Sequence, residues 1–242
     1  MRFDQMIQMM KQMTGKIGSN IYASVQDQNN PHHLSFLRRL QKEMREKDSL
    51  HTPLKQLKAV VLDFETTGFY PEKGDQILSI GAVKVHGESI VNDETYYSLV
   101  QSTDTIPDQI TELTGIKVDD LHDAPSLATA LTQFFEFSKD SLFVAHHSMH
   151  EQSFLKQATK ALTRSAFQQR IVDTSLIVRI IEPTLHLKSL EACCTHFGIE
   201  VNGRHHALHD AYMTAQLWSR YIQFFQDQGY QNLREVYETL AK

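Results

Sequence analysis

Two carboxylates follow a short apolar run near residue 60. The run Ala59–Leu62 leads into Asp63 and Glu65, and Gly68 closes the segment. A short, partly β-branched run that ends at glycine is typical of a buried strand. Side chains alternate along a strand, so the two carboxylates point to one face. They repel each other and are costly to bury, and a hard divalent cation such as Mg²⁺ would relieve both effects. The segment predicts a metal site; the alternative, a surface strand with two solvated acids, is disfavoured by the apolar run.

Polar residues gather again where other predicted strands and helices meet. Segment 144–155 runs from a strand end into a helix and places Glu151 near the helix start, where a carboxylate is favoured. Segment 204–211 opens a later helix and carries His205 and Asp210, and Asp173 follows another short strand. Packing alone does not require polar residues at these places, so these residues are candidates for ionic chemistry.

The predicted elements would bring these segments to one sheet. Strands near 58–66, 77–85 and 89–100 are joined by short connections and predict an antiparallel meander. Short strands at 142–145 and 171–173 alternate with helices near 126–137, 151–162, 174–181 and 189–197, and the last long helices start near 206 and 232. Strands first, followed by alternating strands and helices, predict an α/β fold with a sheet covered by helices.

The first 57 residues differ from the remainder in charge and pattern. They contain nine Lys and Arg against five Asp and Glu, which leaves 15 basic and 24 acidic residues after position 57. Their apolar residues, several of them Met, recur near a helical period. We predict an N-terminal helical extension over 1–57 and a catalytic domain over 58–242. The extension would serve docking or self-association, and its basic helix face is either solvated or a phosphate or partner contact.

Composition narrows the class of protein further. The chain has 242 residues, of which 41% are hydrophobic and 22% charged, as in an ordinary globular protein. No apolar run is long enough to cross a membrane, and the N-terminus has no signal-peptide core. The adjacent Cys193 and Cys194 indicate a reducing compartment. We therefore expect a cytoplasmic protein without a membrane partner. Its acidic body argues against broad binding of duplex nucleic acid, but a small site where metal ions bridge carboxylates to a phosphate is compatible with it.

Three motifs in this order resemble a known family. Residues 63–68 (Asp-Phe-Glu-Thr-Thr-Gly) resemble the first motif of the DEDDh (DnaQ-like) 3′–5′ exonucleases, of the DNA polymerase III proofreading-subunit (epsilon) type within the RNase H-like superfamily. Residues 145–155 resemble the second motif, and residues 205–211 resemble the third, with His and Asp five positions apart. The resemblance covers about residues 58–225. It implies an RNase H-like mixed sheet, an antiparallel meander plus parallel strands, flanked by helices.

The resemblance also implies a set of metal ligands. Asp63, Glu65 and Asp210 would hold one divalent ion, and Asp63 would bridge to a second ion supported by Glu151. The two ions would be Mg²⁺ or Mn²⁺. Two such ions stabilise the attacking and leaving oxygens of a phosphodiester hydrolysis.

The remaining roles concern the proton and the substrate. His205 would be the general base, since an imidazole titrates near neutral pH. Thr66 would help to hold the 3′ nucleotide. The resemblance thus implies a metal-dependent 3′–5′ exonuclease that acts on single-stranded ends, with DNA favoured, in proofreading or repair, and releases 5′-mononucleotides. A DNA polymerase would be a partner.

Three positions depart from the family pattern. Glu151 stands where the family has Asp, His147 where it has Asn, and His150 where it has an aromatic residue. Two alternatives therefore stay open. One is a catalytically weakened relative that binds nucleic acid ends or a polymerase without cutting. The other is an RNA-trimming exoribonuclease, because the motifs do not read the 2′-OH that distinguishes RNA from DNA.

Overall fold

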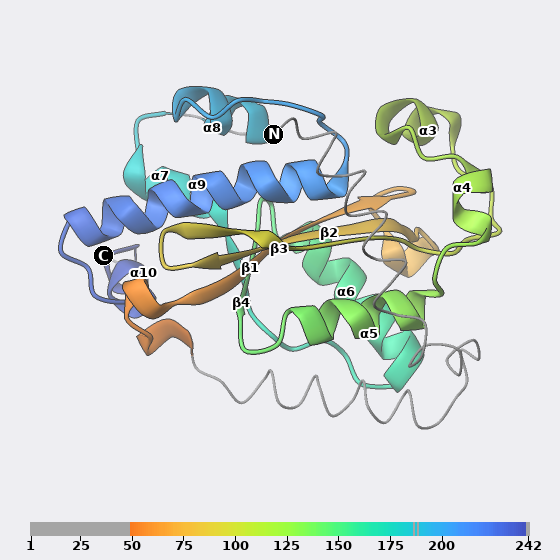
Figure 1. Ribbon diagram of the computed structural model, residues 1–242, viewed down its shortest axis with the longest axis horizontal. Coiled ribbons are helices and arrows are strands. Elements are labelled where there is room, and N and C mark those ends of the chain that lie inside the picture. Colours follow the sequence, from red (N-terminus) through yellow and green to blue (C-terminus); the bar gives the residue numbers. More distant parts are fainter. Residues whose placement is uncertain (1–48, 186, 188, 241–242) are drawn as a thin grey trace.

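A single mixed sheet forms the centre of the molecule (Figure 1). The computed structural model describes residues 49–185, 187 and 189–240. The sheet has the order β3-β2-β1-β4-β5. Its strands are β1 (Lys58–Thr66), β2 (Ile77–His86), β3 (Ser89–Leu99), β4 (Leu142–Ala145) and β5 (Ile171–Asp173). The predicted meander and short parallel strands are confirmed, and so is the RNase H-like class of α/β fold.

Strand β1 lies between the antiparallel and the parallel halves of the sheet. It pairs antiparallel with β2, where Asp63 faces Gly81, and parallel with β4. Strand β4 pairs parallel with β5, where Ala145 faces Asp173. The carboxyl ends of β1, β4 and β5 therefore meet at one edge, and the polar segments that follow these strands lie there together.

Helices cover both faces of the sheet (Figure 1). Two short helices, α3 and α4, follow the meander, α5 and α6 pack on one face, and α7 to α10 pack on the other. Their bounds are α3 (Asp108–Thr114), α4 (Val118–His122), α5 (Leu127–Phe137), α6 (Met149–Thr163), α7 (Thr174–Ile181), α8 (Leu190–His196), α9 (Ala207–Asp227) and α10 (Leu233–Leu240). None of the helices in the described part of the chain has the length and apolarity that crossing a membrane requires.

Alternation along β1 decides which layer its carboxylates meet. Ala59 and Val61 pack in the core beneath α9, whereas Val60 and Phe64 pack in the opposite core beneath α5 and α6. Asp63 and Glu65 follow Ala59 and Val61 at alternate positions, so they lie on the same face of β1. Both carboxylates therefore face α9 rather than α5, and the first turn of α9 becomes the natural place for a third ligand.

A glycine allows α9 to approach the sheet closely. A Cβ added to Gly81 would lie 2.2 Å from the backbone carbonyl carbon of Ala207, the first residue of α9. Gly81 is the neighbour of Asp63 across the β1–β2 pair. The absence of a side chain at Gly81 thus lets the start of α9 lie directly over the end of β1 that carries Asp63.

The predicted division of the chain at residue 57 stays a prediction, because residues 1–48 lie outside the described residues. The last residues of the predicted extension form two 3₁₀ turns, Ser49–His51 and Leu54–Gln56. Leu54 and Leu57 are each 2% exposed and belong to the core beneath α9 and α10. The Leu54 N–H donates to the carbonyl of Gln231 at 2.8 Å. Residues 54–57 therefore pack against the same core as the sheet.

Candidate active site

Three carboxylates from distant parts of the sequence converge at the end of β1. Asp63 and Glu65 come from β1, and Asp210 comes from the first turn of α9. One ligand atom from each of the three lies within 4.8 Å of the others. They line a pocket of about 330 Å³ that also contains Glu151 and His205. Four predicted metal ligands and the predicted base therefore share one pocket.

The carboxylates lie in surroundings that disfavour their ionised form. Burial, with repulsion from Glu151 and Asp210, raises the pKa of Asp63 well above its usual range. Burial raises the pKa of Glu65 to about 8 and that of Glu151 to about 8. The pKa of Asp210 is also raised, because burial outweighs the nearby Arg204 guanidinium. Arg204 does not offset this effect, and divalent cations would supply further positive charge.

Two buried oxygens in the pocket also fit a cation site. Among the described residues, Oδ1 of Asp210 and Oε2 of Glu151 have no hydrogen-bond partner. Buried polar atoms are rarely left unpaired in folded proteins. Carboxylate oxygens are the ligands that Mg²⁺ and Mn²⁺ prefer. The donor set therefore fits one or more hard divalent ions.

Glu151 lines the pocket without joining the three-carboxylate cluster. It lies in the first turn of α6, as the sequence predicts, and is 3% exposed. It is near enough to Asp63 to raise the pKa of that carboxyl, yet it falls outside the set whose ligand atoms lie within 4.8 Å. The structure thus places the fourth acid beside the cluster.

The two adjacent histidines of the third motif have different surroundings. His205 lines the pocket, and its backbone N–H donates to Oδ2 of Asp210 at 3.2 Å. The ring of His206 stacks on Tyr97, with centroids 4.6 Å apart, and on His209 at 4.3 Å. His206 is a packing residue between α9 and β3, so only His205 of the two is placed for a chemical role.

The departures in the second motif also have physical explanations. His147 has φ 59°, in the left-handed region where Asn and His are both enriched. His150 places its ring 4.9 Å from that of Phe154 and 5.7 Å from that of Phe69, so it supplies the flat packing surface of an aromatic residue. Both replacements keep the local backbone and packing.

Thr66 is buried at the end of β1 and does not line the pocket itself. Its hydroxyl donates to the carbonyl of Gly68 at 2.7 Å and lies 3.3 Å from Nε2 of His150. Phe69, which follows Gly68 in the chain, is 75% exposed and lines the pocket. Thr66 therefore fixes the turn that carries an exposed aromatic ring to the mouth of the pocket.

His146 is a pocket residue that the sequence did not single out. The Thr174 hydroxyl oxygen lies 2.9 Å from Nδ1 of His146 and 3.3 Å from the carbonyl oxygen of Ala145. The other ring nitrogen of His146, Nε2, has no hydrogen-bond partner within the described part of the chain. Burial lowers the pKa of His146 to about 4, so the ring is neutral near pH 7.

Asp173 shapes the rim of the pocket. Its Oδ1 accepts from the backbone N–H groups of His147 at 3.1 Å and Ser175 at 2.8 Å. Its Oδ2 accepts from the backbone N–H of Ser148 at 3.0 Å. The carboxylate thus caps α7 and also holds the turn between β4 and α6, which is a structural task. The polar residue noted in the sequence at this strand end is explained by these bonds.

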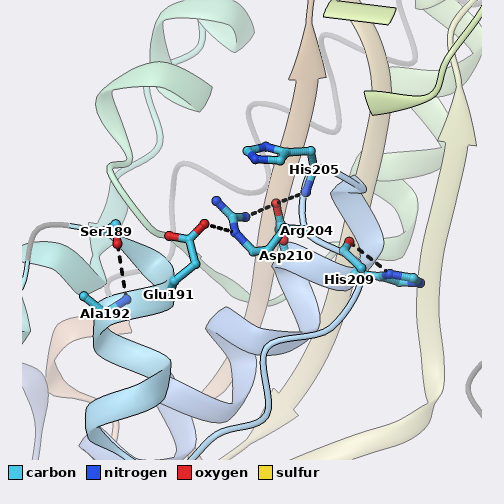
Figure 2. Close-up of polar contacts among 8 residues, drawn as sticks. Ser189, Glu191, Ala192, Arg204, His205, His209 and Asp210 are labelled. Atoms are coloured by element: carbon cyan, nitrogen blue, oxygen red, sulfur yellow. Dashed lines mark hydrogen bonds and ion pairs between the residues drawn. The ribbon is translucent and has the colours of Figure 1, made fainter. Parts of the chain in front are cut away.

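Arg204 was also missed from the sequence, although it directly precedes His205. Figure 2 shows its guanidinium between Glu191 of α8 and Asp210 of α9. It lines the pocket, and its charge offsets only part of the rise that burial causes in the pKa values of Asp63 and Glu65. Because Glu191 lies far from all three motifs in the sequence, only the packing of α8 could reveal this pair.

Comparisons with known proteins agree with the fold and the site. The sequence model of an exonuclease family, the RNase T type, matches residues 60–218. The chain belongs to this exonuclease family, and the resemblance inferred from the three motifs is confirmed. DEDDh exonucleases depend on divalent metal ions, and the cluster at Asp63, Glu65 and Asp210 supplies the oxygen ligands for them.

Among curated relatives, the DNA polymerase III subunit epsilon of Aquifex aeolicus is 34% identical over 164 residues, which is 68% of this chain and 80% of that protein. The PolC-type DNA polymerase III of Thermotoga maritima is 33% identical over 177 residues. That match covers 73% of this chain but 13% of the polymerase. This chain therefore spans a small part of the PolC-type relatives.

Solved structures share the fold at lower identity. The nuclease domain of 3′hExo, a DEDDh family member bound to rAMP, has a TM-score of 0.61 at 19% identity and covers 69% of this chain and 92% of that one. Exonuclease X in complex with 5′ overhanging duplex DNA has a TM-score of 0.56 at 21% identity, covering 72% and 95%.

We expect the stability of the metal-free protein to fall as pH rises from about 4.5 to about 8. The pKa values of Glu65 and Glu151 in the folded chain are about 8, above the usual 4.5, so the folded state keeps protons that the unfolded state releases. The free energy of unfolding then decreases with pH across this window. Mn²⁺ binds ionised carboxylates, so it should reverse the fall at the alkaline end. Melting temperatures measured in EDTA and in Mn²⁺ test this, and a flat EDTA profile would contradict it.

Proposed function

We propose that this chain is a metal-dependent 3′–5′ exonuclease that removes 5′-mononucleotides from single-stranded nucleic acid, with DNA favoured. The observation that carries the proposal is the convergence of Asp63, Glu65 and Asp210 in one pocket with Glu151 and His205. A phosphodiester is anionic and repels a nucleophile, so hydrolysis needs positive charge at the site and a group that takes a proton. The pocket provides ligands for the first and an imidazole for the second.

Each residue then has a defined task. Asp63, Glu65, Glu151 and Asp210 would hold two divalent ions, which when bound stabilise the attacking and leaving oxygens of the displacement. His205 would take the proton from the attacking water as general base. Its place on the pocket wall, beside Asp210, supports this task.

The mouth of the pocket suits the base of the terminal nucleotide. Phe69 is 75% exposed there, and nucleic acid bases stack on exposed aromatic rings in a sequence-tolerant way. Thr66 would help to hold the 3′ nucleotide by fixing the turn that presents this ring. Such a site recognises an unpaired end rather than a sequence.

DNA is favoured because the curated relatives bear the name DNA polymerase III. The same names support a polymerase as partner. We propose the N-terminal extension, residues 1–57, as the element for docking or self-association, through the part that precedes the buried Leu54, on the basis of its separate charge and Met-rich pattern.

The experiment that tests the proposal uses 5′-labelled linear single strands of DNA and RNA and a closed circular DNA strand. We expect a ladder of products shortened from the 3′ end in Mg²⁺ or Mn²⁺, faster on DNA than on RNA. We expect no cleavage in excess EDTA and none on the circle. Digestion of the circle at an equal rate, or full activity in EDTA, would overturn the proposal. A faster rate on RNA would favour the RNA-trimming alternative.

We expect activity to be greater in Mn²⁺ than in Mg²⁺ because of Glu151. Glu is one methylene longer than the family's Asp, and the extra length changes how the carboxylate meets the second ion. Mg²⁺ demands near-octahedral geometry and gives up water reluctantly, so it tolerates this change less well. Steady-state rates in each metal should therefore show near-complete loss in Glu151→Gln and a shift back toward Mg²⁺ in Glu151→Asp.

Two outcomes would refute this role for Glu151 or change its meaning. Unchanged rates in Glu151→Gln would show that the carboxylate has no function at the metals. An inactive natural chain together with an active Glu151→Asp variant would instead support the weakened-relative alternative. The weakened-relative alternative is retained because Glu151 lies outside the set of carboxylates whose ligand atoms are within 4.8 Å of one another.

A further inference from the structure

Arg204 connects α8 to a carboxylate of the metal cluster. Its Nε donates to Oε1 of Glu191 at 2.5 Å, and its NH1 donates to Oδ2 of Asp210. The Arg204 side chain is 24% exposed and that of Asp210 only 5% exposed, so the second contact is shielded from water. Ion pairs shielded in this way hold their geometry better than pairs at the surface.

The two oxygens of Asp210 have different environments. Oδ2 accepts from the Arg204 guanidinium and from the backbone N–H of His205 at 3.2 Å (Figure 2). Oδ1 is buried and has no hydrogen-bond partner in the described residues. Two donors on one oxygen fix the rotation of the carboxylate and leave the other oxygen available. Asp210 is thus held in one orientation before any cation binds.

This geometry requires an arginine. A guanidinium presents several N–H donors in a rigid fork, so it can bind Glu191 through one edge and Asp210 through another at the same time. A lysine in this position would keep the charge, but its single ammonium on a flexible stem would not reproduce the fixed fork. The Glu191 contact therefore determines where the guanidinium meets Asp210.

We propose that Glu191 and Arg204 are positioning residues that orient Asp210 for cation binding, so that α8 forms part of the metal site. The inference rests on the proposed metal-dependent activity. Neither residue belongs to the carboxylate cluster whose ligand atoms lie within 4.8 Å. Partners that orient a metal ligand in this way commonly contribute about 10–100-fold to metal affinity.

A competing interpretation predicts the opposite change in metal affinity. If the guanidinium only competed with the cation for Asp210, its removal would strengthen metal binding, because one positive charge would leave the pocket. If it served only as a charge, lysine would replace it without effect. Metal affinity therefore separates the three readings, and it can be measured without nuclease activity.

The test is the affinity of the full chain for Mn²⁺, followed through the electron paramagnetic resonance signal of the free ion. We expect Arg204→Lys to weaken Mn²⁺ binding by about 10–100-fold. Glu191→Ala should weaken binding in the same direction, and the double variant should bind no more weakly than Arg204→Lys alone, since the two residues act in series. Glu191→Gln keeps an acceptor for Nε and should retain more affinity than Glu191→Ala.

The matched control is a second Arg–Glu pair, which lies on the surface and away from the pocket. Arg234 donates to Glu238 at 2.8 Å one turn along α10, with both side chains more than half exposed. Glu238→Ala should leave Mn²⁺ affinity unchanged. Circular dichroism should show that every variant is folded before its affinity is compared.

Three results would overturn the inference. Unchanged affinity in Arg204→Lys would show that Arg204 acts only through its positive charge. Tighter binding in Arg204→Gln, which removes the positive charge, would make the guanidinium a competitor of the cation. Additive losses in the double variant would show that Glu191 does not act through Arg204. If the natural chain bound no Mn²⁺ at all, the proposed function would fail first, so the two failures are distinguishable.

Discussion

Asp63→Asn is expected to reduce the rate of strand hydrolysis by about a thousandfold or more. Cations at a phosphoryl site contribute several kcal/mol of transition-state stabilisation, and ~4 kcal/mol corresponds to a factor of ~10³. Asp63 lies at the centre of the cluster, where both Glu151 and Asp210 raise its pKa. Asn has the same shape but no charge, so the variant should fold and lose cation binding. Single-turnover hydrolysis of a labelled strand in Mn²⁺ measures the loss.

The same substitution should not lower the melting temperature in EDTA. Asp63 is a half-buried acid among other acids, so removing its charge relieves repulsion in the metal-free protein. The stabilisation by Mn²⁺ should disappear in this variant. Asp119→Asn, on the exposed side of α4, is the control and should keep activity and the response to Mn²⁺. A slow Asp63→Asn variant that is still stabilised by Mn²⁺ would contradict the assignment of Asp63 as a ligand.

Replacing His205 should lower turnover by about 10²–10⁴-fold with little change in substrate affinity. A general base acts in the chemical step, so its loss lowers kcat more than it alters KM. Because His205 has φ 61°, alanine there would also strain the backbone. His205→Asn is therefore the better variant, since Asn tolerates the left-handed region and cannot act as the base. Steady-state kcat and KM of His205→Asn on a labelled strand in Mn²⁺ measure this change.

His206 provides the comparison. Its ring packs against Tyr97 and His209, so His206→Ala should lower the melting temperature and leave the rate per folded molecule within a few-fold of the natural value. If His206→Ala removed the activity while His205→Asn kept it, the assignment of the general base to His205 would be wrong.

The fold and the cluster could be predicted because short-range patterns encode them. Alternation along β1 places Asp63 and Glu65 on one face, and the apolar run before them fixes the strand as buried. The third ligand, Asp210, was implied by the resemblance of residues 205–211 to the family's third motif. These features depend on neighbours in the sequence, and the structure confirms that they meet.

The remaining features depend on contacts between distant elements. Glu191 meets Arg204 because α8 packs on α9, and no spacing in the sequence relates Glu191 to the motifs. The place of the His146 ring depends on Thr174, which lies at another strand–helix junction. The left-handed backbone at His147 and His205 was not marked by glycine. Sequence patterns locate ligands, whereas tertiary packing determines how each ligand is oriented.

The most direct test is a crystal structure of the chain with Mn²⁺ and a 5′-mononucleotide, with the ions located by their anomalous scattering. Two anomalous peaks are expected in the pocket, both in contact with Asp63, with Asp210 and Glu65 at one ion and Glu151 on the side of the other. The phosphate of the nucleotide should lie against both ions and its base near Phe69. An absence of peaks at Asp63, or a nucleotide bound outside this pocket, would contradict the account.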